Sequence, residues 1–87
     1  MTRFQFRPRW KEELVVTANE GSFCFDLAMG MLIAFLPTEH DWPDKAPKWA
    51  HGLYPILREE LGAWCGANNA RLVIDHSGVV FDATPEQ

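Results

Sequence analysis

Residues 23–36 read Phe-Cys-Phe-Asp-Leu-Ala-Met-Gly-Met-Leu-Ile-Ala-Phe-Leu, and the rest of the chain must fold around this stretch. Apart from the weakly acidic thiol of Cys24, its one ionisable group is the carboxyl of Asp26. The run is shorter than the ~18 uninterrupted apolar residues that indicate a membrane span. We therefore expect no contact with a membrane, and we expect other elements of a folded domain to cover the run.

The first half of this run has the period of a β-strand. Phe23, Phe25 and Leu27 alternate with Cys24 and Asp26, so the two sets would lie on opposite faces of a sheet. The apolar set would face the core.

Gly30 divides the run, and we predict a tight turn or bulge near residues 29–30. A further strand over residues 31–36 is apolar on both faces, as in a central strand. A helix is the alternative, because Phe25, Met29, Leu32 and Leu36 recur three or four residues apart. We favour the strand because Gly30 interrupts a helix and Pro37 ends the run.

The residues before this run predict two more strands. Residues 3–10 alternate Phe with Arg or Gln, and Pro8 restricts this segment to an edge strand or an arm. Residues 13–18 are rich in β-formers. Residues 19–22, Asn-Glu-Gly-Ser, form a turn signal that makes a hairpin with the run.

After the run, residues 37–48 form a Pro-rich acidic loop, and residues 49–67 form the one main helix. The expected apolar stripe of this helix is Trp49, Leu53, Ile56, Leu57, Leu61 and Trp64. Gly52 and Pro55 disturb its start, so it is either kinked or preceded by a short turn, with the main helix from about residue 53.

The end of the chain predicts a compact hairpin. Residues 71–75 and 79–82 are short β-rich runs joined by a turn, and residues 84–87 form a frayed tail. We therefore predict a single α+β domain over residues 1–87. Its mainly antiparallel sheet has four to six strands, in the order β-β-β-β-α-β-β, with the helix across one face.

The charge of the chain is unevenly distributed. Residues 1–11 carry four of the eight bases and no acid, whereas residues 12–87 carry all 12 acids. The acidic body disfavours nucleic acid, which binds by phosphate neutralisation. It favours a basic protein partner through electrostatic steering.

Cys24 and Cys65 lie in separate apolar elements and predict buried free thiols rather than a disulfide framework. Basic residues run through positions 3–11 with no apolar segment of a signal peptide behind them. We therefore expect a cytoplasmic location.

No pattern in the sequence indicates an active centre. His40, Asp41 and Asp44 crowd the Pro-rich loop but lack the paired spacing of zinc ligands. Cys65 would lie near the end of a helix, where the dipole disfavours the thiolate that a neighbouring His76 would have to generate. We predict no enzymatic activity, no metal and no cofactor.

The Pro-rich loop carries the remaining candidate site. Glu39, Asp41, Trp42 and Asp44 combine acids with an aromatic residue, as in many binding hot spots. We therefore predict a small acidic protein-binding module, of the kind of a bacterial immunity or inhibitor protein that occludes a basic toxin. In one alternative Trp42 instead caps the core, and in another the protein is a self-assembling, structural homodimer.

Overall fold

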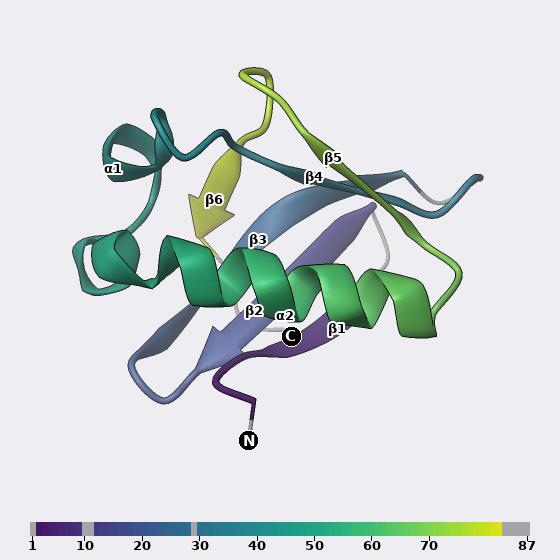
Figure 1. Ribbon diagram of the computed structural model, residues 1–87, viewed down its shortest axis with the longest axis horizontal. Helices are drawn as coiled ribbons and strands as arrows, with labels where there is room; N and C mark the ends of the chain where they lie inside the picture. The colour runs from purple at the N-terminus through teal and green to yellow at the C-terminus, as the bar shows by residue number, and fades with distance from the viewer. Residues whose placement is uncertain (1, 10–11, 29, 83–87) are drawn as a thin grey trace.

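The computed structural model describes residues 2–9, 12–28 and 30–82 (Figure 1). The elements are β1 (Gln5–Arg9), β2 (Glu13–Ala18), β3 (Gly21–Ala28), β4 (Ile33–Leu36), α1 (Trp42–Lys45), the 3₁₀ helix η1 (Lys48–Leu53), α2 (Tyr54–Ala67), β5 (Arg71–Ile74) and β6 (Val80–Asp82). This is the predicted α+β class, with a six-stranded, mostly antiparallel sheet and one main helical segment. None of the helices in the described ranges is long and apolar enough to cross a membrane.

β3 is the centre of the sheet, whose strand order is β1-β2-β3-β4-β5. β2 pairs along one side of β3. On the other side, β6 pairs with residues 23–25 and β4 with residues 27–28. All these pairs are antiparallel, as is β1 with β2, whereas β4 and β5 are parallel.

The strand interpretation of residues 23–36 is confirmed, and the helical alternative is wrong. β3 buries Phe23, Phe25 and Leu27 and exposes Asp26, as the alternation predicts. β4 begins at Ile33 rather than at residue 31, after a turn that includes Gly30. Met29 lies outside the described residues.

The strands before β3 also follow the prediction. β2 has the predicted bounds, and β1 is an edge strand that contains Pro8. Residues 10–11 of the predicted strand or basic arm, and the predicted tail at 84–87, lie outside the described residues.

The predicted hairpin at the end of the chain is wrong. β5 pairs with β4, and β6 pairs with β3, so the two runs never pair with each other. The helical segment returns the chain to the free edge of β4, where residues 71–74 pair in parallel with residues 33–36. The chain then crosses the end of β4 to reach β3.

A short turn precedes the main helix, as in the second of the two alternatives predicted from the sequence. A 3₁₀ turn, η1, precedes α2, which starts at Tyr54 with Pro55 in its first turn. The buried residues of α2 are Tyr54, Leu57, Leu61 and Cys65. Ile56 is 41% exposed, so its place in the predicted stripe is wrong. It follows Tyr54 by two residues, or about 200° around the helix.

α2 lies across the face formed by β1, β2 and β3 (Figure 1). One core joins the two layers, and its fully buried members include Leu14, Val16, Phe23, Phe25, Leu27, Leu57 and Leu61. Cys24 and Cys65 are free and buried, as predicted. Burial raises the pKa of both thiols above the ordinary value.

Gly78 lies where the crossing chain meets the end of β4. A Cβ atom there would come within 2.7 Å of the Pro37 nitrogen and 2.8 Å of the Leu36 carbonyl carbon. We expect Gly78→Ala to lower the free energy of unfolding by more than about 1 kcal/mol in urea denaturation, because backbone atoms would have to move.

Gly62 supplies the matched control, because a Cβ atom there meets nothing within 4 Å and the residue lies inside α2. Gly62→Ala should raise the free energy of unfolding by roughly 0.5–1 kcal/mol. Equal effects of the two substitutions would contradict the packing described for Gly78.

Candidate functional site

The Pro-rich loop folds into a turn and the single-turn helix α1. Thr38 starts the turn, because its carbonyl oxygen and its Oγ1 both accept the backbone N–H of Asp41, at 3.1 and 3.2 Å. The N–H of Ala46 closes α1 on the carbonyl of Trp42, at 2.9 Å. The carbonyl of Pro37 accepts the Tyr54 hydroxyl at 2.6 Å, which attaches the start of the loop to α2.

Trp42 is the buried residue of α1, with 1% of its surface exposed. Its ring centroid lies 5.8 Å from Phe23, 6.1 Å from Phe25 and 5.4 Å from Tyr54. Its indole N–H donates to the carbonyl of Ala50 at 2.9 Å. In this position Trp42 caps the core, as in the alternative considered from the sequence, and its side chain is not available as a surface anchor.

Lys45 fixes the loop that connects β5 to β6 against α1. Its ammonium group donates to the carbonyls of His76, at 2.7 Å, and Gly78, at 2.5 Å. The ring of His76 is 80% exposed, and its Nδ1 lies 3.0 Å from Oδ2 of Asp41. Three contacts therefore join two segments that are more than 30 residues apart in the sequence.

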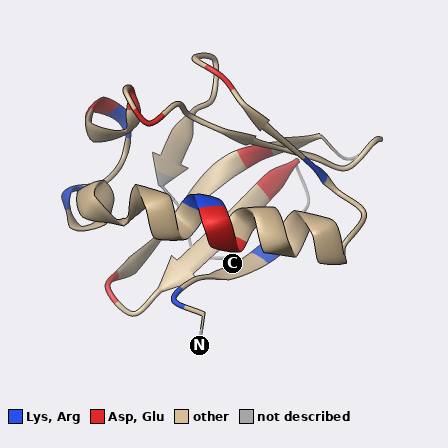
Figure 2. Ribbon diagram, viewed as in Figure 1, with Lys and Arg blue, Asp and Glu red and all other residues tan. Residues whose placement is uncertain are grey.

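Four carboxylates occur on these two segments: Glu39, Asp41, Asp44 and Asp75, which we call the acidic patch (Figure 2). Glu39, Asp44 and Asp75 are exposed, whereas the Asp41 side chain is 23% exposed. The structure places the three predicted acids, Glu39, Asp41 and Asp44, at the same end of the molecule.

Sequence reasoning did not predict Asp75 at this site. The carboxyl ends of parallel strands meet at one edge of a sheet, and Leu36 at the end of β4 pairs with Ile74 at the end of β5. Asp75 therefore starts a loop beside the one that carries Asp41. A strand-helix-strand order is the signal that points to such parallel pairing.

Hydrogen bonds hold two of the carboxyl groups in the ionised form. The bond from His76, followed by that from Thr38, lowers the pKa of Asp41 below its ordinary value of 3.8. Asp75 accepts the hydroxyl and the backbone N–H of Ser77, and these bonds lower its pKa as well. Both groups therefore stay negative throughout the neutral range.

The residues weighed for catalysis and metal binding lie as follows. Cys65 is buried in the core with a raised thiol pKa, and the ring of His76 contacts Asp41. Within residues 2–9, 12–28 and 30–82, no three His, Cys, Asp or Glu side chains converge as a metal site.

Comparison with known proteins gives no further assignment: no protein-family model, no curated protein and no solved structure matches the chain.

Replacing the buried indole tests its structural role. We expect Trp42→Phe to lower the free energy of unfolding by about 1–3 kcal/mol, because the Ala50 carbonyl loses its donor inside the core. Trp64→Phe is the comparison, since Trp64 is only partly buried and should lose less. Urea denaturation of both variants measures the difference. A smaller loss of unfolding free energy for Trp42→Phe than for Trp64→Phe would argue against a structural role of the Trp42 indole.

The Asp41–His76 contact predicts a pH dependence of stability. The pKa of Asp41 is lower in the folded chain than in the unfolded chain, so ionised Asp41 stabilises the fold above about pH 4. This stabilisation is lost as the pH falls through the pKa of Asp41 in the folded chain. Unfolding free energies between pH 5 and about 2.5 should therefore fall more steeply for the native chain than for Asp41→Asn. Asp44→Asn, at an exposed position on α1, removes the same charge but leaves the His76 contact in place, so it is the control.

Proposed function

We propose that this protein is a small, non-catalytic binding module that occludes a basic protein partner with its acidic patch. Within that class, it would serve as an immunity or inhibitor protein in the bacterial cytoplasm, with a basic toxin as the partner. The observation that best supports this is that the four carboxylates lie on two segments that hydrogen bonds join to each other and to the core. The proposal gives the protein no catalytic residue, metal or cofactor.

The framework matters because preorganisation lowers the entropic cost of binding. Trp42 anchors α1 from inside the core, and Lys45 holds the neighbouring loop from outside it. Lys45 donates to two backbone carbonyls, and its charge also helps to lower the pKa of Asp41. The segments that carry the acids are therefore ordered before a partner binds.

The acids would have different roles in the complex. Glu39 and Asp44 are exposed and would pair with Arg or Lys of the partner. The Asp41 carboxylate already contacts His76, so it would contribute mainly its field. The summed negative potential would steer a cationic cleft toward this end of the molecule.

Self-association is the second candidate, and the position of β1 at the edge of the sheet favours it. The edge is partly blocked, however. Pro8 has no N–H, and the N–H of Phe4 is donated to the Glu60 carboxylate at 2.8 Å. Light scattering separates the two candidates: a dimer that captures no partner would favour the structural homodimer.

The acidic patch predicts a salt-sensitive association. With the partner obtained by tagged purification from the native cell and mass spectrometry, stopped-flow mixing would give the association rate constant at several ionic strengths. We expect Glu39→Gln combined with Asp44→Asn to lower it by about tenfold at low salt, because steering contributes about 10- to 1,000-fold. The difference should shrink toward 0.15 M salt, where the Debye length is about 8 Å.

The matched control is Glu12→Gln combined with Asp26→Asn. These two exposed residues line a separate hollow with Phe35, and the pair changes the net charge by the same amount. It should leave the rate close to that of the native chain. Equal effects of the two double variants, or an association rate constant that does not change with salt, would count against the acidic patch as the binding site.

A further inference from the structure

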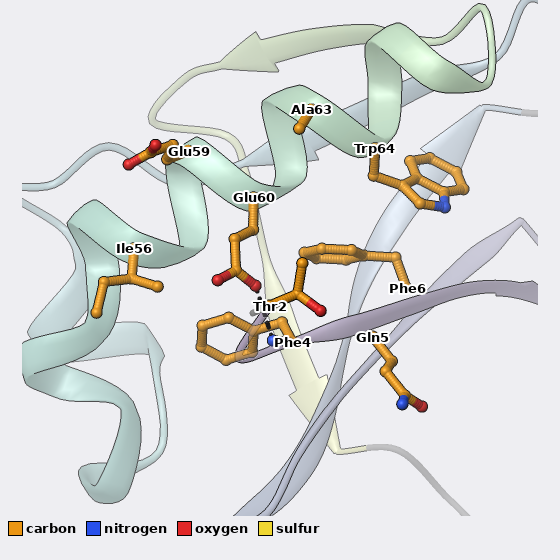
Figure 3. A pocket seen from close by; sticks show the side chains of 9 residues that line it. All are labelled: Thr2, Phe4, Gln5, Phe6, Ile56, Glu59, Glu60, Ala63 and Trp64. Carbon is orange, nitrogen blue, oxygen red and sulfur yellow. Dashed lines mark hydrogen bonds between the residues drawn. The ribbon is translucent and has the colours of Figure 1, made fainter.

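A groove that shares no residue with the acidic patch runs between the start of β1 and one side of α2 (Figure 3). Its volume is about 810 Å³, within the range of roughly 300–1,000 Å³ that is usual for binding pockets. Phe4 and Phe6 line it from the strand side, and Ile56, Ala63 and Trp64 line it from the helix. Five of the nine residues that line the groove are thus apolar.

The two walls of the groove are tied together by Glu60. Its carboxylate accepts the backbone N–H of Arg3, at 2.9 Å to each oxygen, and that of Phe4, at 2.8 Å. Figure 3 shows this carboxylate reaching from α2 to the strand. The groove therefore exists in the folded chain before any ligand arrives, and the Glu60 oxygens are already used by backbone amides.

Apolar surface is left uncovered along this groove. Ile56 is 41% exposed, and Phe6 and Trp64 are only partly buried, with ring centroids 6.2 Å apart. Aromatic side chains that border a hollow are frequent centres of binding energy. This combination favours insertion of an apolar side chain.

The ionisable side chains that line the groove are of one sign. Among the described residues that line it, the ionisable ones are Glu59 and Glu60. Arg3 adjoins it through its backbone but turns its guanidinium to Glu20. Glu59 lies on the outer rim, exposed and pointing away from β1 (Figure 3). An occupant with Lys or Arg beside its apolar side chain is complementary to this rim, whereas an acidic peptide or an anionic membrane is not.

The shape of the edge argues against an added β-strand. A new strand beside β1 would need its outward amides, and Phe4 has already donated its N–H while Pro8 has none. The occupant would therefore bind through side chains that enter the groove rather than through a backbone ladder.

We propose that this groove is a second docking site, which accepts an apolar side chain flanked by Lys or Arg from a partner protein. It does not depend on the acidic patch, so either site can fail while the other stands. A partner that uses both would contact the molecule at two separate places.

Peptide titration of the full-length, ¹⁵N-labelled protein tests the groove directly. The probe is acetyl-Lys-Arg-Trp-Leu-Arg-Lys-amide. One comparison peptide replaces the four bases by acids, and another replaces Trp and Leu by Ser. We expect the probe to cause saturable chemical-shift changes of the Ile56 and Ala63 amides and of the Trp64 indole N–H. Neither comparison peptide should cause them. Equal shifts with the acidic peptide, shifts confined to Glu39–Asp44, or binding only to anionic vesicles would overturn the proposal.

Two matched variants on α2 sharpen the test. Ala63 lines the groove and Ala67 does not, and both are exposed. Ala63→Gln should fill the groove and weaken probe binding by at least about fivefold, whereas Ala67→Gln should change it by less than about twofold. Unchanged amide spectra elsewhere would show that both variants are folded. Equal affinities of the two variants would overturn the assignment.

Glu59 provides the electrostatic arm of the test. Glu59→Gln should weaken probe binding by about two- to threefold at low salt, and the effect should fade as salt screens the exposed charge. Glu39→Gln makes the same change of charge in the acidic patch and should leave probe binding unchanged. If Glu39→Gln had the larger effect, the cationic part of the probe would be binding to the acidic patch, contrary to the proposal.

Discussion

The indole of Trp42 lies between the sheet and the helical segment, in contact with Phe23, Phe25 and Tyr54 and bonded to the carbonyl of Ala50. Most other features of this end of the molecule depend on that burial. An isolated four-residue helix is unstable in water, because nucleation is costly. α1 exists because its first residue is part of the core, and the acids around it are positioned by the same contact.

The position of Trp42 also changes how the surface is understood. A Trp among acids suggests an aromatic anchor that enters a partner, with the acids around it. In the folded chain the indole of Trp42 is buried in the core, and Glu39 and Asp44 are exposed at the surface. Recognition at this end would therefore depend on charge and preorganisation rather than on buried aromatic area, which favours a fast, salt-sensitive encounter.

The carboxylates of this protein serve different purposes according to what they touch. Glu60 accepts backbone amides and holds the first residues of the chain to α2, which partly closes the edge of β1. Glu13 pairs with Arg9 across the hairpin at 2.7 Å. Glu39, Asp44 and Asp75 are exposed. The net charge of −4 alone does not distinguish these roles, because it counts structural and exposed acids together.

The sequence by itself determined the local structure. Alternation along residues 23–28 specified a strand and its buried face, and β-formers indicated a strand over residues 13–18. Gly52 with Pro55 indicated either a kink or a separate turn at the start of the helix. These features depend on backbone preferences and on side-chain period, which are properties of neighbouring residues. The sequence pattern did not define which face of α2 is buried, and Ile56 lies off that face because it is about 200° around the helix from Tyr54.

Only the tertiary structure decided which strands pair and which side chains meet. Residues 71–74 have a β-rich pattern that suits a hairpin with β6 as well as it suits the edge of β4, and the return of α2 over the sheet selected β4. That pairing placed Asp75 and His76 beside Asp41, and the groove between β1 and α2 arose from the docking of the helix. Such contacts depend on the apolar surfaces that remain uncovered once each element has formed, and no short stretch of sequence contains that information.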